Sequence, residues 1–181
     1  MAVDGDSVVV SNGVYHELIN FNGKAITVMS EDGDAAGTII DGGQSSGSVV
    51  SFVNSETSES VLQGFTIRNG IAYQGGGIFI GNDPPAIPAS PTITSCIITG
   101  NQSTNSGGGI YAKYSTLSLS DTAIRNNYSG AAGGGVYLKY CNGTFIECSV
   151  ENNNANNGGG IYIKESTGDI SIRDSEINQN I

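Results

Sequence analysis

The sequence predicts an all-β fold, a right-handed parallel β-helix in which about seven coils of three short strands each stack into a single-stranded solenoid. Three observations carry this prediction. A Gly-Gly-Gly triplet begins at residues 75, 107, 133 and 158, at intervals of 32, 26 and 25 residues. Apolar and polar residues alternate after each triplet, and an asparagine returns at the same place in successive coils. We expect residues 1–181 to form one such domain.

The first strand of each coil follows the triplet, in the phrases GGGIFIG, GGGIYAK, GGGVYLK and GGGIYIK. Successive residues of a strand face opposite sides, so alternation separates an inward set from an outward one. The inward set of the first strand is Ile78, Ile110, Val136 and Ile161, with Ile80, Ala112, Leu138 and Ile163. The second and third strands have inward columns of their own: Leu62, Ile93, Leu119, Phe145 and Ile172, and Ile67, Ile98, Ile124, Val150 and Ile177.

The turn after the third strand carries Asn101, Asn127, Asn153 and Asn180 in register. Stacked asparagines can hydrogen-bond to the coils on both sides and tolerate left-handed backbone angles, so a structural ladder is predicted. Cys96 and Cys148 share an inward column two coils apart. That separation, roughly 9 to 10 Å, exceeds disulfide reach, and we expect free thiols. In this alignment Asp121 is interpreted as an insertion before the third strand.

The N-terminal third is less regular but of the same kind. Its short β-type runs, at 7–10, 25–28, 37–41 and 48–52, are separated by glycines. Charged residues are only 13% and the net charge is -10, which argues against nucleic acid as a partner. No apolar run approaches the ~18 residues of a membrane span, so no membrane insertion is expected. The start of the chain lacks the basic and apolar regions of a secretion signal.

With the repeat established, the chain resembles bacterial pectate-lyase-like right-handed β-helix proteins, in VDGDSVVVSNGVYHELINFNGKAITVMSEDG, TIIDGG and VLQGFTIRNG. The phrase GGGIY with its Asn-rich turn is also similar to the repeats of polymorphic outer-membrane proteins. The resemblance implies the fold. It leaves function open, because this superfamily includes lyases, hydrolases, epimerases, adhesins and passive stalks.

Both ends of the chain depart from the pattern of that superfamily. Its members usually begin with an amphipathic helix that caps the first coil, whereas this chain starts at VDGDSV and stops at Ile181 after an Asn turn. Bare coil ends present unpaired strand edges. We therefore expect a fragment without terminal caps, or a chain that caps itself as an end-to-end homo-oligomer.

The outward face of the triplet strand is the candidate ligand-binding surface. It carries two columns: the aromatics Phe79, Tyr111, Tyr137 and Tyr162, and the cations Lys113, Lys139 and Lys164. Stacked like charges disfavour one another, and an acidic polysaccharide would offset them. The alternative interpretation is structural: tyrosine suits an exposed strand, and Lys113 and Lys139 can lie against Tyr114 and Tyr140.

The residues indicate no active site. The outward positions of the triplet strand include no Asp, and the single histidine, His16, has no evident partner. No cofactor is expected. Calcium is an open alternative at two acidic turns, Asp4 with Asp6 and the segment 31–34, although each supplies too few oxygens alone.

The sequence thus favours a non-catalytic extracellular or cell-surface module, a scaffold or adhesin that contacts acidic polysaccharide along the Tyr/Lys face. Two alternatives remain open. One is a polysaccharide lyase or glycoside hydrolase of the superfamily that the chain resembles, and the other is a self-assembling structural rod.

Overall fold

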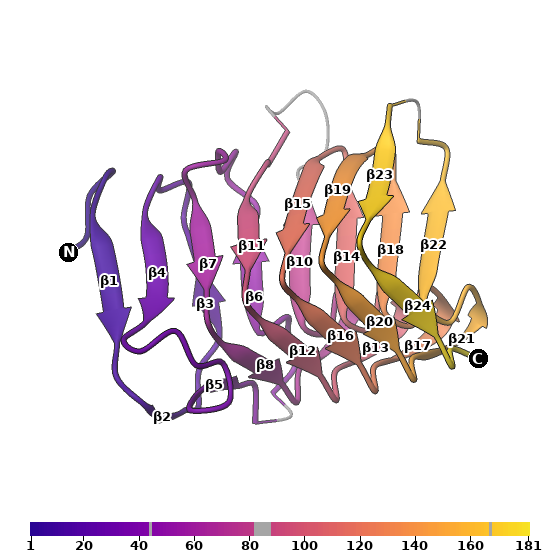
Figure 1. The fold of residues 1–181 in the computed structure, drawn as a ribbon, viewed down its shortest axis with the longest axis horizontal. Helices are drawn as coiled ribbons and strands as arrows, with labels where there is room; N and C mark the ends of the chain where they lie inside the picture. The colour runs from indigo at the N-terminus through magenta and orange to yellow at the C-terminus, as the bar shows by residue number, and fades with distance from the viewer. Residues whose placement is uncertain (44, 82–87, 167) are drawn as a thin grey trace.

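The computed structural model describes residues 1–43, 45–81, 88–166 and 168–181, and in these residues the chain is a parallel β-helix. Its coils lie side by side from the N-terminal end to the C-terminal end (Figure 1). Every strand pair is parallel, and the strands form four sheets, which we call A, B, C and D. Along the chain, a coil passes through sheets A, B, D and C in that order. No helix in the described part of the chain is long and apolar enough to cross a membrane.

The A and B sheets each contain seven of the described strands, in agreement with the predicted seven coils. The A sheet consists of β1 (Ser7–Val10), β4 (Thr27–Ser30), β7 (Val61–Gln63), β11 (Thr92–Thr94), β15 (Thr116–Ser120), β19 (Asn142–Ile146) and β23 (Ile170–Arg173). The B sheet consists of β2 (Gly13–Tyr15), β5 (Thr38–Asp41), β8 (Thr66–Arg68), β12 (Ile97–Thr99), β16 (Ala123–Arg125), β20 (Ser149–Glu151) and β24 (Glu176–Asn178).

The C and D sheets complete the coil. The C sheet, which contains the triplet strands, consists of β3 (Ile19–Asn20), β6 (Val50–Phe52), β10 (Ile78–Gly81), β14 (Ile110–Lys113), β18 (Val136–Lys139) and β22 (Ile161–Lys164). The D sheet consists of β9 (Ile71–Gln74), β13 (Gln102–Ser106), β17 (Tyr128–Ala132) and β21 (Asn154–Asn157).

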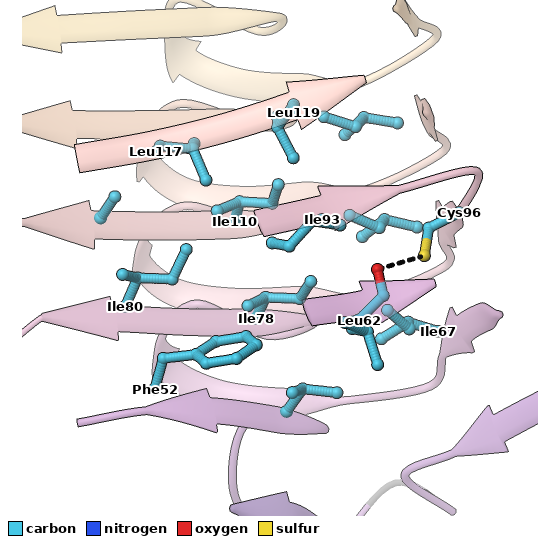
Figure 2. Packing of buried hydrophobic residues seen from close by; sticks show 14 of the residues in the cluster. Phe52, Leu62, Ile67, Ile78, Ile80, Ile93, Cys96, Ile110, Leu117 and Leu119 are labelled. Atoms are coloured by element: carbon cyan, nitrogen blue, oxygen red, sulfur yellow. Dashed lines mark hydrogen bonds between the residues drawn. The ribbon is translucent and has the colours of Figure 1, made fainter. Parts of the chain in front are cut away.

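The core consists of the predicted inward columns. Ile78 pairs with Ile110, Ile93 with Leu119 and Ile98 with Ile124, one coil apart in each case. These side chains are fully buried and stack on their counterparts in the adjacent coils (Figure 2). A single cluster of buried apolar side chains extends from Phe21 to Val150. Each coil buries its apolar face only because it lies between two others.

The D sheet corrects the predicted number of strands per coil. The alternation predicts three strands, but the Asn-rich segments after the third strand form a fourth in the coils that contain β9, β13, β17 and β21. These strands include few β-favouring residues; β21, for example, is Asn-Ala-Asn-Asn. Their pairing comes from the backbones of neighbouring coils, which local propensity does not reveal.

The predicted asparagine ladder is confirmed. The Nδ2 of Asn127 donates to the carbonyl oxygen of Ile98 (2.9 Å) and to Oδ1 of Asn153 (3.0 Å). Its own Oδ1 accepts from the backbone N–H of Asn101 at 3.0 Å. The left-handed backbone, however, belongs to the residue before each ladder asparagine and not to the asparagine itself: Gly100, Asn126, Asn152 and Gln179.

Asp121 is not an insertion. The strands on both sides of it keep the register of the coil before, with Thr94 opposite Ser120 and Ile97 opposite Ala123. Asp121 therefore occupies the same A/B corner position as Ser95 and Glu147. All three have left-handed backbone angles, with φ between 45° and 54°. The additional residues of this coil lie at the start of β15, which begins two residues before Ser118, the partner of Thr92.

The predicted free thiols are confirmed. Cys96, Cys141 and Cys148 are buried and unpaired. The thiol of Cys96 lies 3.7 Å from the carbonyl oxygen of Leu62, as drawn in Figure 2. Burial raises the pKa of Cys96 to about 11. These cysteines fill the core as small apolar side chains.

Asp41, the last residue of β5, connects its coil to the next one through Arg68 and Asn69. Its carboxylate is buried and accepts hydrogen bonds from Arg68 Nε (2.7 Å), from Asn69 Nδ2 (3.0 Å) and from the backbone N–H of Gly43 (2.8 Å). Burial alone would raise the pKa of Asp41, but the bonds from Gly43, Asn69 and Arg68 outweigh it and hold the pKa below its ordinary value of 3.8.

Asp41→Asn is expected to lower the free energy of unfolding at neutral pH by about 2 kcal/mol, because it removes a charged acceptor. The Arg68 side chain is 37% exposed, so most of the loss is assigned to the Gly43 and Asn69 bonds. Because the folded pKa is depressed, the contribution is complete above the unfolded pKa and disappears as pH falls through the folded one. Urea titrations from pH 7 downward measure this; a gap between wild type and variant that persists unchanged at about pH 2 would contradict it.

Candidate functional site

The aromatic column of the C sheet forms a continuous stack. Phe79, Tyr111, Tyr137 and Tyr162 face outward and follow one another in register. The ring centroids of Tyr111 and Tyr137 are 5.2 Å apart and the planes are nearly parallel, at 3°. The stack continues to Phe79 on one side and to Tyr162 on the other, with centroid distances of 5.3 and 5.5 Å.

This stack is covered, which corrects the prediction of an exposed binding platform. Tyr111 is only 3% exposed and Tyr137 only 8%. Ala132, at the end of β17, packs against these rings, with Phe79 and Tyr162 at the edges of the same cluster. The D strand therefore lies over part of the outward face of the C sheet. Burial raises the pKa of Tyr137, and the neighbouring Tyr162 and Glu165 raise it further.

The lysine column, by contrast, remains partly accessible. Gly81, Lys113, Lys139 and Lys164 are aligned in register on consecutive coils, as predicted. The Nζ of Lys113 lies 4.9 Å from the ring centroid of Tyr114, and Lys139 lies equally close to Tyr140. The rings of Tyr114 and Tyr140 stack at 4.8 Å. We call this column, Lys113, Lys139 and Lys164 with Tyr114 and Tyr140, the lysine edge.

Glu165 gives the lysine edge an internal counter-charge. Its carboxylate lies 3.5 Å from Lys139 Nζ. It also accepts a hydrogen bond from Tyr140, and this bond together with the charges of Lys139 and Lys164 lowers the pKa of Glu165. The same bond raises the pKa of Tyr140 to about 12. Part of the like-charge repulsion along the edge is therefore offset within the protein.

The acidic turns considered for calcium use their carboxylates in local hydrogen bonds. Asp4 accepts from the backbone N–H of Ala25 and Asp6 from that of Val3. Asp32 accepts from Asn12 Nδ2 and Asp34 from the backbone N–H of Ala36. Among the residues that the structure describes, no three His, Cys, Asp or Glu side chains are arranged to hold a metal ion.

An acidic groove at the A/B corner was missed by the sequence reasoning. It has a volume of about 350 Å³ and lies between the 33–35 segment and the corners of consecutive coils, where Asp121 and Glu147 line it beside Cys96 and Thr122. Treating Asp121 as an insertion hid this column. The signal that would have found it is the constant spacing of the corner residues Ser95, Asp121, Glu147 and Asp174.

A comparison of the sequence with protein-family models agrees with the parallel coils and their inward columns. Residues 37–181 match the family model described as "Right handed beta helix region". The chain belongs to this right-handed β-helix family. The family model covers all the coils that carry glycine triplets, and the parallel sheets are those of its fold. Comparison with curated proteins and with solved structures gives no match.

Proposed function

We propose that this member of the right-handed β-helix family is a non-catalytic scaffold or adhesin module, located outside the cell or at its surface, that contacts acidic polysaccharide along the lysine edge. The observation that carries the proposal is the alignment of Lys113, Lys139 and Lys164 on three consecutive coils. Strand spacing places these cations about 4.8 Å apart in a row. A polyanionic chain lying along the coil axis can neutralise such a row more completely than Glu165 alone.

The state of the tyrosines favours a non-catalytic role. A general acid or base works best with a pKa near the operating pH. The pKa values of Tyr137 and Tyr140 are raised above that of an ordinary tyrosine, and so lie further from neutral pH. A lyase or glycoside hydrolase of the same fold is the alternative. A hydrolase would need two carboxyl groups at a defined separation on one face, whereas the carboxylate described on this edge, Glu165, is engaged with Tyr140 and Lys139.

Replacing Lys113, Lys139 and Lys164 together with alanine is expected to weaken binding to polygalacturonate or alginate at least about tenfold. Affinity electrophoresis in gels containing each polymer measures this, and added salt should weaken the wild-type interaction. The matched control replaces Lys24, Arg125 and Arg173, which removes the same charge away from the edge. Equal retardation of the two triple variants would contradict the proposal, and release of unsaturated sugars by the wild type would favour the lyase.

End-to-end assembly of residues 1–181 is a second candidate function, and the coil that contains β22, β23 and β24 bears on it. Ile163, Ile172 and Ile177 belong to the inward columns and are exposed there. The A, B and C sheets each run from an N-terminal edge, β1, β2 or β3, to a C-terminal edge, β23, β24 or β22. A second copy translated along the axis would therefore bring three pairs of parallel edges together and cover these isoleucines.

If this assembly forms, the mass of the wild type measured by sedimentation equilibrium should rise with concentration. The double variant Ile172→Lys with Ile177→Lys should remain monomeric, because it introduces charges into the contact. Ser171→Lys, on the outward side of the same strand, is the control and should associate like the wild type. A monomer mass for the wild type at every concentration tested would exclude the assembly.

A further inference from the structure

Charge is absent from one wall of this acidic chain. The chain has 17 acidic and 7 basic residues, yet the segments 69–80, 101–112, 126–138 and 152–163 contain no Asp, Glu, Lys or Arg. In the structure these four segments supply the D strands, the glycine triplets and the start of the C strands. Between these segments the charged residues include Lys113 and Lys139 of the lysine edge, Asp121 and Glu147 at the A/B corner, and Arg125 and Glu151 on the B sheet. The D sheet is therefore an uncharged wall in four consecutive coils.

The outward side of this wall is nevertheless rich in hydrogen-bonding groups. In β13 and β21 the exposed positions are Gln102, Thr104, Asn154, Asn156 and Asn157, and Ser103 and Ala155 between them are buried. In the described part of the chain the side-chain amides of Gln102 and Asn154 have no hydrogen bond to another protein group, whereas Asn156 Nδ2 donates to the carbonyl oxygen of Gly130 at 2.8 Å. Register places Gln102 directly between Ile71 and Tyr128.

Two exposed aromatic rings stand among these amides. Tyr73, on β9, is 67% exposed and Tyr128, on β17, is 49% exposed. The strand between them is β13, and the register aligns Tyr128 with Ile71, two residues before Tyr73, so the two backbones are roughly 12 Å apart on a diagonal across the sheet. Asn105 Nδ2 donates to the hydroxyl of Tyr73 at 2.7 Å, which fixes the position of that ring. We call Tyr73, Gln102, Thr104, Tyr128, Asn154 and Asn156 the neutral face.

The A sheet provides a contrast within the same molecule. Its outward side is also low in charge, but it carries small hydroxyl and aliphatic side chains, such as Thr92, Ser118 and Thr144, and no outward aromatic ring. Low charge alone therefore does not distinguish the neutral face. What distinguishes it is the combination of two exposed rings with the unengaged amides of Gln102 and Asn154.

We infer that the neutral face binds an uncharged polysaccharide chain laid across the D strands. Tyrosine rings offer rigid apolar area to the faces of sugar rings with little loss of side-chain entropy, and amides offer both donors and acceptors to sugar hydroxyls. The absence of charge matches a ligand without charge, since no cation or anion has to be desolvated without a partner. This binding is separate from the proposed contact at the lysine edge, in residues and in ligand.

Affinity electrophoresis in gels of hydroxyethylcellulose, dextran and mannan tests this inference. The wild-type chain should be retarded by at least one of these neutral polymers. The double variant Tyr73→Ala with Tyr128→Ala should bind about tenfold more weakly. Tyr15→Ala removes a partly exposed tyrosine from β2 of the B sheet and should bind like the wild type. Circular dichroism checks that the variants keep the fold, which surface substitutions of this kind should not disturb.

Two further measurements distinguish neutral binding at the neutral face from acidic binding at the lysine edge. Retardation by the neutral polymer should not change with added salt, whereas binding at the lysine edge should weaken. The Lys113, Lys139 and Lys164 triple variant should retain neutral binding while losing acidic binding. No retardation of the wild type by any of the three polymers, or equal retardation of the Tyr73/Tyr128 double variant, would overturn the inference.

Discussion

Gly108→Ala is expected to destabilise the fold by more than about 4 kcal/mol, or to prevent folding. A Cβ at this middle glycine of a triplet would lie 2.3 Å from the carbonyl oxygen of Tyr128 and 2.5 Å from that of Gly134. Both atoms belong to the backbone of the next coil, which is itself held by bonds such as Gly109 N–H to the Gly134 oxygen (3.1 Å). The coils would have to separate to admit one methyl group, so the destabilisation exceeds that of ordinary overpacking.

Gly143→Ala is the matched control for this substitution. Gly143 lies in β19, has an ordinary backbone φ, and its added Cβ would meet nothing closer than 3.4 Å. Its stability should stay within about 0.5 kcal/mol of the wild type, or rise slightly because alanine restricts the unfolded chain. Thermal melts followed by circular dichroism compare the two variants. A melting temperature of Gly108→Ala equal to that of Gly143→Ala would show that the triplet does not require glycine for close packing.

Asn127→Ala is expected to cost about 3 to 5 kcal/mol of unfolding free energy. The substitution leaves the backbone N–H of Asn101 and the carbonyl oxygen of Ile98 without this side chain, and both lie in the interior. It also breaks the contacts of Asn127 with Asn101 and Asn153, which continue the ladder on either side. Buried polar groups left without partners lose the full cost of desolvation, and no water can reach a ladder that is 1% exposed here.

The control for the ladder is Asn154→Ala, one residue beyond the next ladder position and exposed on the D sheet. The same chemical change there should cost less than about 0.5 kcal/mol. Urea denaturation compares the two variants directly. Equal losses of stability would mean that the buried hydrogen bonds of the ladder add nothing measurable.

Much of the fold could be predicted because each coil repeats the same local pattern. Alternation places Ile78 and Ile110 inward, and the triplets fix the register that aligns Lys113 with Lys139. The fourth strand could not be predicted in this way. Asn154–Asn157 has neither apolar alternation nor β-favouring residues, and it becomes a strand because β17 pairs with it.

The candidate site shows the limit of alternation more sharply. Alternation correctly predicts that Tyr111 and Tyr137 point out of the coil, but outward is not the same as exposed. Ala132 covers their rings from the D strand, a contact between different walls that no single strand encodes. Asp121 was misplaced for a different reason: the additional residues of its coil lie at the start of β15, before Ser118, and not at the corner.

The hydrogen bonds between coils have a consequence for how the chain folds. Along the ladder and the triplets each bond joins residues about one coil apart in sequence, 26 in the case of Asn101 with Asn127. Every coil added to a growing stack therefore closes a loop of nearly the same length and at nearly the same entropic cost. Folding of such a chain can begin at any pair of adjacent coils and spread in both directions, and unfolding starts at the ends, where a coil has one neighbour instead of two. Amide protons of β14 and β15, which have a paired strand on both sides, should accordingly exchange with solvent more slowly than those of β22 and β23, which pair on one side only.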